Sequence, residues 1–176
     1  MLAGWGNYFF LVGSAAAALI GLMFIVATLT AGRDRGQLEP GKKLYTSPIV
    51  CHLGVVLLLS GAAVAPTMVP RWFGLITIIL AVAGFAYGIR IAIGIARAEL
   101  TSNFSGFDIF WYGVAPSLAY AALGVSGLAM VRGQAWSSSA VAASAMVLLL
   151  VSIHNEWDLV TFLAPQAPGP NDQTRD

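Results

Sequence analysis

Five long apolar stretches constrain this chain more strongly than any other feature of its sequence. They cover residues 5–30, 45–65, 72–96, 109–131 and 136–162. A helix needs about 20 mostly apolar residues to cross the hydrocarbon core of a bilayer, and every stretch reaches that length. Inside lipid each backbone polar group must find its partner within the protein, and a helix satisfies this condition by itself. The sequence therefore predicts an all-α, polytopic membrane protein built as a bundle of five transmembrane helices.

The composition limits the classes of partner. Hydrophobic residues make up 58% of the 176 residues and charged residues only 10%, whereas a soluble domain carries about 25% charged residues. A net charge of +1 lacks the basic footprint of a nucleic-acid-binding protein. Cys51 is the only cysteine, which excludes an intramolecular disulfide and a thiolate cluster. We therefore expect the lipid bilayer as the partner, no nucleic acid and no cofactor.

The segments between the apolar stretches are too short to form a soluble domain. We expect one transmembrane domain over residues 1–164 and a disordered polar tail, rich in proline and glycine, over residues 165–176. The first stretch follows a start without basic residues and is too long for the apolar part of a signal peptide. We therefore expect it to be the first transmembrane helix.

Basic residues predict the orientation of the bundle. Five crossings place seven of them on one side, namely Arg33, Arg35, Lys42, Lys43, Arg90, Arg97 and Arg175, and two on the other, Arg71 and Arg132. Cytoplasmic loops carry the excess of Lys and Arg, so we expect the N-terminus outside and the C-terminus in the cytoplasm. Interfacial aromatic residues would then be Trp5, Tyr8, Trp72 and Trp136 outside, with Trp111 and Trp157 inside.

Small residues recur at helical spacing in three of the stretches. They are Gly13, Ala17 and Gly21, then Ala81, Gly84, Gly88 and Ala92, and finally Gly113, Ser117 and Ala121. Small side chains allow membrane helices to approach closely, so these stripes predict tight packing. We favour contacts within one chain over contacts between subunits. Pro116 removes a backbone donor inside the fourth stretch, where we expect a kink.

The last stretch ends in a dense group of polar residues, within the sequence SIHNEWDLVTF. His154 and Asp158 are four residues apart and share a helix face, with Asn155 beside them. We expect these three side chains to face the bundle. Glu156 lies roughly on the opposite face, and we expect it to turn toward headgroups and water.

Three further ionisable residues, His52, Arg90 and Asp108, fall in the same half of the predicted bundle or at its cytoplasmic edge. Ionisable side chains within a membrane are costly, so they usually have partners and often have a task. The candidate polar cluster, a hypothetical proton or ion site, therefore comprises His52, Arg90, Asp108, His154, Asn155 and Asp158.

Each member of this cluster also has a structural interpretation. Arg90 can extend to the headgroups or pair with an aspartate, and a neutral His52 bonded to a neighbouring carbonyl is as consistent with the sequence as a functional histidine. A metal site would require His52, His154 and Asp158 to converge, but their spacing is common by chance and we predict no metal. The sequence lacks GxSxG, HExxH and phosphate-loop motifs, so we predict no catalytic residues.

Three segments, FFLVGSAAAALIGLMFIVATL, TSPIVCHLGVVLLLSG and IHNEWDLVTF, resemble a group of short bacterial multi-pass membrane proteins of unknown function. The resemblance covers most of the chain. It implies a bacterial inner membrane and supplies no activity, cofactor or site residue.

Three functions fit these observations. We favour a non-catalytic accessory or structural membrane protein whose polar cluster holds helices together or docks a partner, which would not be an enzyme. The alternative is an oligomeric channel or transporter-like protein for protons or small ions that uses His52, His154 and Asp158. An enzyme acting on a lipid or prenyl substrate at the inner leaflet ranks third. The sequence leaves open whether the partner is a second copy or another membrane protein.

Overall fold

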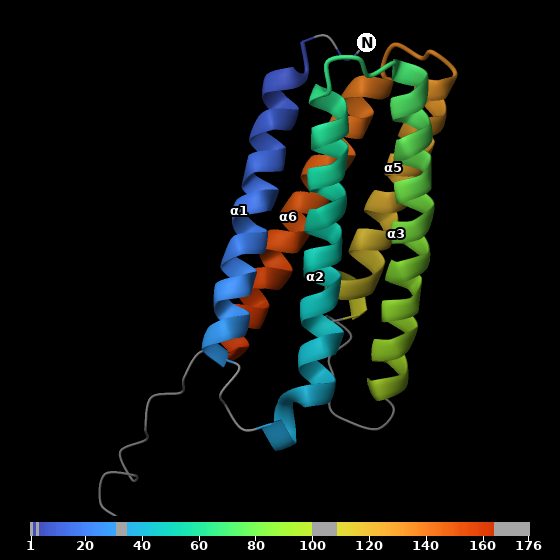
Figure 1. Ribbon diagram of the computed structural model, residues 1–176. Helices are drawn as coiled ribbons and strands as arrows, with labels where there is room; N and C mark the ends of the chain where they lie inside the picture. The colour runs from blue at the N-terminus through green and yellow to red at the C-terminus, as the bar shows by residue number, and fades with distance from the viewer. Residues whose placement is uncertain (1, 3, 31–34, 100–108, 164–176) are drawn as a thin grey trace, which may run out of the picture.

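A computed structural model describes residues 2, 4–30, 35–99 and 109–163 of the chain. In these residues the elements are α1 (Gly6–Thr30), α2 (Arg35–Val64), α3 (Pro70–Glu99), η1 (Phe110–Val114), α5 (Ala115–Val131) and α6 (Ser137–Leu163), as shown in Figure 1. No strand occurs in the described part of the chain. The predicted all-α class is confirmed there. The polar tail predicted over residues 165–176 lies outside the described residues.

Four helical segments are long and apolar enough to cross a membrane: Gly6–Thr28, Pro70–Arg97, Phe110–Val131 and Ser137–Thr161. They correspond to the first, third, fourth and fifth stretches of the sequence. α2 differs, because it begins at Arg35 and its apolar part, Pro48–Val64, is only 17 residues long. Pro70 opens α3, a position that suits proline because the first helical N–H has no partner in the helix.

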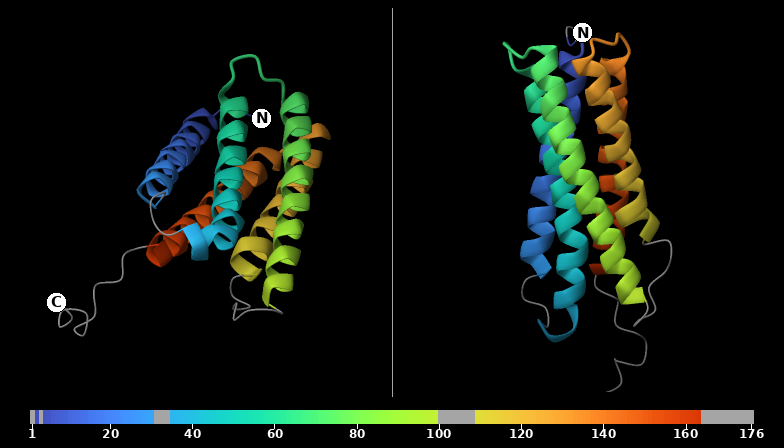
Figure 2. Two further views of the ribbon diagram at one scale, coloured as in Figure 1. Left: turned by 60° about the horizontal axis from the view of Figure 1, so that its bottom comes forward. Right: turned by 90° about the vertical axis from the view of Figure 1, so that its right-hand side faces the viewer.

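The helices form a ring in chain order, and successive helices run in opposite directions (Figures 1 and 2). α1 packs on α2, α2 on α3, α3 on α5 and α5 on α6, while α6 returns to α1 and also contacts α2. The chain therefore enters the bundle at one end, and α6 finishes at the opposite end. This arrangement gives α6 more neighbours than its position at the end of the chain would indicate.

Glycine residues bring α3 and α5 into close contact. A Cβ added at Gly74 would lie 2.9 Å from the carbonyl oxygen of Gly127, and one added at Gly127 would lie 3.0 Å from the carbonyl oxygen of Gly74. At Gly113 an added Cβ would lie 2.9 Å from Cα of Ala92. Backbone atoms cannot move aside as side chains do, so this interface requires glycine at these positions. Gly88 also faces Ser117, and Gly113 faces Ala92, so these members of the two predicted stripes serve contacts within one chain.

The other predicted stripe is only partly used. Gly13 of α1 faces Ser60 of α2, where an added Cβ would lie 2.7 Å from the serine Cβ. Gly21 has nothing within 4 Å, and Ala17 is exposed. Ala121, which continued the stripe on the fourth stretch, is exposed as well. Helix contact thus occupies a shorter length of α1 than the sequence pattern covers.

Pro116 acts on the turn that precedes it. The residues before the proline form the π-helical turn η1, in which the N–H of Ala115 donates to the carbonyl of Phe110. Proline cannot donate to a carbonyl four residues earlier, and a π-helical turn is one way for a helix to absorb that loss. The hydroxyl of Ser117 donates to the carbonyl of Gly113 at 2.7 Å and so satisfies one acceptor of the altered turn.

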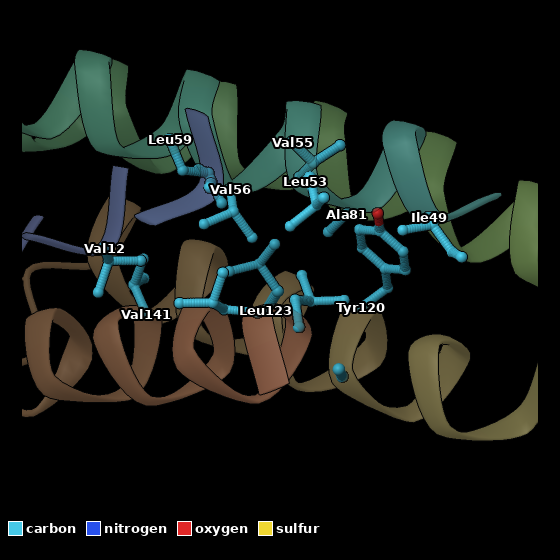
Figure 3. Packing of buried hydrophobic residues seen from close by; sticks show 14 of the residues in the cluster. Val12, Ile49, Leu53, Val55, Val56, Leu59, Ala81, Tyr120, Leu123 and Val141 are labelled. Carbon is cyan, nitrogen blue, oxygen red and sulfur yellow. The ribbon is translucent and has the colours of Figure 1, made fainter. Parts of the chain in front are cut away.

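The core is a column of aliphatic side chains enclosed by the ring, as Figure 3 shows from close by. Leu53, Val56 and Leu59 of α2 are fully buried there and lie near Leu123 of α5 and Val141 of α6. Tyr120 is the large polar side chain in this view, and its ring extends from α5 toward α2. Because its surroundings are otherwise aliphatic, the phenol requires a hydrogen-bond partner.

Candidate functional site

The partner of Tyr120 is His52. Its Nδ1 lies 2.9 Å from the phenol oxygen, and the tautomer of the imidazole decides which group donates. Both side chains are 1% exposed. Tyr120 is ten residues from Phe110 and eleven from Val131, so the pair lies near the middle of the apolar segment that η1 and α5 form together. The ring of Tyr87, on α3, meets the imidazole edge-on at a centroid distance of 6.3 Å.

Gly84 creates the space for this pair. A Cβ at Gly84 would lie 2.6 Å from Cδ1 of Tyr120 and would overlap Cε1 and Cζ even more closely. The tyrosine ring therefore lies directly against the backbone of α3. The glycine stripe of α3 thus has a second consequence, since it sets the depth at which the phenol of Tyr120 meets His52 on α2.

A second polar group lies where η1 meets the last turns of α6. The hydroxyl of Tyr112 is 3.1 Å from the carbonyl oxygen of Asn155, to which it donates, and 3.2 Å from Oδ2 of Asp158. The amide Nδ2 of Asn155 donates to the carbonyl of Trp111 at 3.0 Å. His154 stacks on the ring of Trp111, with centroids 3.9 Å apart and planes inclined by 32°. Each of the two elements, η1 and α6, therefore supplies a side chain that donates a hydrogen bond to the backbone of the other.

The facing of this group differs from the sequence prediction at Glu156 and, in part, at Asp158. Asn155 is fully buried, as expected for a side chain that faces the bundle. Glu156 was expected to turn toward water, and this prediction is wrong, because its side chain is only 6% exposed. Asp158 is exposed despite its contact with Tyr112. Glu156 is buried because α6 contacts α1 as well as α5 and α2, so more than one face of α6 is covered.

Arg90 takes no part in either polar group. It is exposed on α3, and no ion pair joins it to Asp158 within the described residues. It lines an open surface depression together with Arg97, two turns further along the same helix. Asp108, the other candidate partner of Arg90, lies outside the described residues. The pairing of Arg90 with Asp158, one of the structural interpretations of this arginine, is therefore not formed.

The candidate metal ligands do not meet. Among the residues that the structure describes, no group of three or more His, Cys, Asp or Glu side chains could hold a metal ion. His52 faces Tyr120, whereas His154 stacks on Trp111 near the end of the bundle. The described structure thus does not bring His52, His154 and Asp158 together. Their separation follows from depth, because Tyr120 is eight residues beyond Tyr112, about 12 Å along a helix.

Several buried polar atoms have no hydrogen-bond partner within the described residues. Among them are Nε2 of His52, Oγ of Ser60, Oδ1 of Asn155 and Oε2 of Glu156. An unpaired polar atom in apolar surroundings costs free energy. The two polar groups can therefore bind helices together, and each also keeps one nitrogen or oxygen atom that is able to bond to something else.

Sequence reasoning missed the aromatic partners. Tyr112 and Tyr120 hold the polar side chains of α2 and α6, and Trp111 supplies both a carbonyl and a ring. One signal was present: two tyrosines stand inside the fourth apolar stretch, where a buried phenol needs a partner. The sequence does not say which partner, because that depends on how far each helix is rotated about its axis.

Comparison of the chain with protein-family models, with curated protein sequences and with solved structures found no match.

Proposed function

We propose that the chain is an integral membrane protein with five crossings, its N-terminus outside and its C-terminus in the cytoplasm of a bacterial cell. The alternating direction of the helices supports this topology, because α1 then begins at one end of the bundle and α6 finishes at the opposite end. The number of crossings depends on α2. Its apolar part has 17 residues, about 26 Å at 1.5 Å per residue, which is at the short end of the range for a crossing.

The outer surface of the bundle supports insertion into lipid. Large apolar side chains are more than half exposed on every long helix, for example Phe24 on α1, Leu58 on α2, Ile79 on α3, Val125 on α5 and Leu150 on α6. A soluble monomer rarely exposes apolar patches that continue around the whole molecule. Trp72 and Trp136, at the starts of α3 and α6, and Trp157, near the end of α6, are exposed at the levels where interfacial aromatic residues belong.

The role we propose is non-catalytic, that of a structural or accessory protein of the inner membrane. One observation carries this proposal: the polar side chains near the end of α6 are bonded to the neighbouring helix. Tyr112 bonds to the backbone of Asn155, and Asn155 bonds to the backbone of Trp111. Interhelical bonds of this kind fasten a bundle and require no transported species. A folded platform of this kind can bind another membrane protein or a second copy of the chain.

Topology and transport can be tested separately. Cys51→Ser protein with a single cysteine added at either end, labelled in intact cells by an impermeant maleimide, should react at the N-terminus only. Purified protein in liposomes loaded with a pH-sensitive dye should leak protons no faster than empty liposomes. Labelling of both ends from outside, or a protein-dependent leak, would contradict the proposed topology or role respectively.

A second candidate, an oligomeric proton or small-ion pathway, is supported by a specific observation. Nε2 of His52 and Oδ1 of Asn155 are buried and unpaired, and such atoms suit a hydrogen-bonded relay through water or a second subunit. If the leak appears and His52→Ala abolishes it while Gly21→Ala does not, this candidate replaces the structural role. Gly21 is a suitable control because nothing lies within 4 Å of an added Cβ.

A further inference from the structure

An apolar groove runs along the outside of the bundle between α1 and α6. Its volume is about 320 Å³, and its walls include Leu22 and Ile25 of α1 together with Ile153 and Val160 of α6. Leu22, Ile25 and Ile153 are each between 41% and 52% exposed, so the groove opens outward. A groove with such walls matches a hydrocarbon chain, and a bilayer supplies hydrocarbon chains on this side.

One carboxyl group interrupts the apolar lining. Glu156 lines the groove with a side chain that is 6% exposed, and its Oε2 has no hydrogen-bond partner. A buried carboxylate without a donor is costly and normally acquires one. Apart from the neighbouring Trp157, which is 71% exposed, the residues that line the groove have apolar side chains without donors. The donor that Glu156 requires is therefore expected from a molecule that enters the groove.

We propose that this groove binds an aminophospholipid, with one acyl chain between α1 and α6 and the primary ammonium of its headgroup bonded to Glu156. A primary ammonium offers three N–H donors and a charge opposite to that of the carboxylate. The quaternary ammonium of phosphatidylcholine has the charge but no donor, and phosphatidylglycerol has a net charge of the wrong sign. This inference goes beyond the proposed non-catalytic role, but it rests on the proposed insertion of the bundle into a membrane.

The depth of Glu156 agrees with a headgroup contact. It lies seven residues before Leu163, the last residue of α6, which is about 10 Å along the helix. Trp157 follows it directly, and exposed tryptophan is typical of the level where headgroups meet the hydrocarbon core. An acyl chain can then extend along the groove toward Leu19, two turns of α1 before Val26.

Lipid retention measures the proposal directly. The full chain is purified in mild detergent, mixed with equal amounts of phosphatidylethanolamine, phosphatidylcholine and phosphatidylglycerol of identical acyl chains, and analysed by native mass spectrometry. We expect phosphatidylethanolamine to be retained about tenfold over phosphatidylcholine, which corresponds to about 1.4 kcal/mol and is the scale of one charge-assisted hydrogen bond. Glu156→Gln should bring this ratio close to one. Asp158→Asn, which changes an exposed carboxyl two residues away, should leave the ratio unchanged.

Three results of this experiment would overturn the proposal: equal retention of the two zwitterionic lipids by the unaltered protein, the same loss of selectivity in Asp158→Asn, or a dimer whose interface excludes lipid from the groove.

A second measurement avoids any dependence on the folding of the Glu156 variant. Dicyclohexylcarbodiimide reacts with carboxyl groups in apolar surroundings, so unaltered protein in bilayers should be labelled at Glu156 about tenfold more slowly with phosphatidylethanolamine than with phosphatidylcholine. Equal labelling rates would refute the contact.

Discussion

The substitution Gly84→Ala tests how the glycine stripe of α3 controls the buried polar pair. The added methyl group would lie 2.6 Å from Cδ1 of Tyr120, whereas ordinary contacts begin at 3.4 Å, so the ring must move by at least 0.8 Å. The phenol oxygen is now 2.9 Å from Nδ1 of His52. A displacement of 0.8 Å toward Nδ1 crowds the imidazole, whereas the same displacement directly away from Nδ1 lengthens the separation beyond the 3.6 Å at which a hydrogen bond is lost.

The expected cost has two parts. Forcing an extra methyl group into a packed core costs about 1–3 kcal/mol, and a hydrogen bond between membrane helices contributes about 0.6 kcal/mol on average and up to about 1.7. Gly84→Ala should therefore lower the free energy of unfolding by about 2–4 kcal/mol. The sign of this change is informative, because replacing glycine by alanine in a helix interior normally raises the free energy of unfolding by up to about 1 kcal/mol.

The measurement is equilibrium unfolding in mixed micelles of sodium dodecyl sulfate and a mild detergent, followed by circular dichroism. The matched control is Gly21→Ala on α1, which has open space around the added methyl group and should be neutral or slightly stabilising. Nitrogen chemical shifts of His52 in labelled protein report the hydrogen bond and should change only in Gly84→Ala. If the two variants were equally stable, the tyrosine ring would not lie against the α3 backbone, and the reasoning would fail.

Two further predictions concern contacts within the chain. Tyr112→Phe removes the hydroxyl that bonds to Asn155 and Asp158, and should destabilise the protein by about 0.6–1.7 kcal/mol in the same assay. Asp158→Asn keeps an oxygen acceptor for that hydroxyl and should therefore cost clearly less. A larger cost for Asp158→Asn than for Tyr112→Phe would contradict the assignment of the bond. Gly113→Ala places a methyl group 2.9 Å from Cα of Ala92, which cannot rotate aside, and should cost about 1–3 kcal/mol. Unchanged stability of Gly113→Ala would show that η1 and α3 are farther apart than the structure places them.

Much of the fold could be predicted from the sequence because a membrane-spanning helix has simple requirements of length and apolarity. The length of an apolar stretch determines whether a helix can cross the hydrocarbon, which is why four of the five predicted stretches appear as apolar helices of sufficient length. The small-residue spacing at Gly84, Gly88 and Gly113 likewise indicated where helices approach, since close contact needs the absence of a side chain. α2 was less predictable, because its helix extends well beyond its apolar part.

The candidate site could be predicted only in part, because a pattern along one helix does not determine what the neighbouring helices present to it. Residue type and depth singled out His52 and Asn155, but the partners of these residues come from η1 and α5, at separations of 68 residues for His52 and 44 for Asn155. Glu156 shows the limit most clearly. Helical periodicity placed it opposite the bundle, and the return of α6 to α1 placed it in a groove instead. Sequence determined which segments prefer lipid, because that is a sum over side chains; the tertiary structure alone decided which polar atoms meet, because that depends on the rotation and height of each helix against the others.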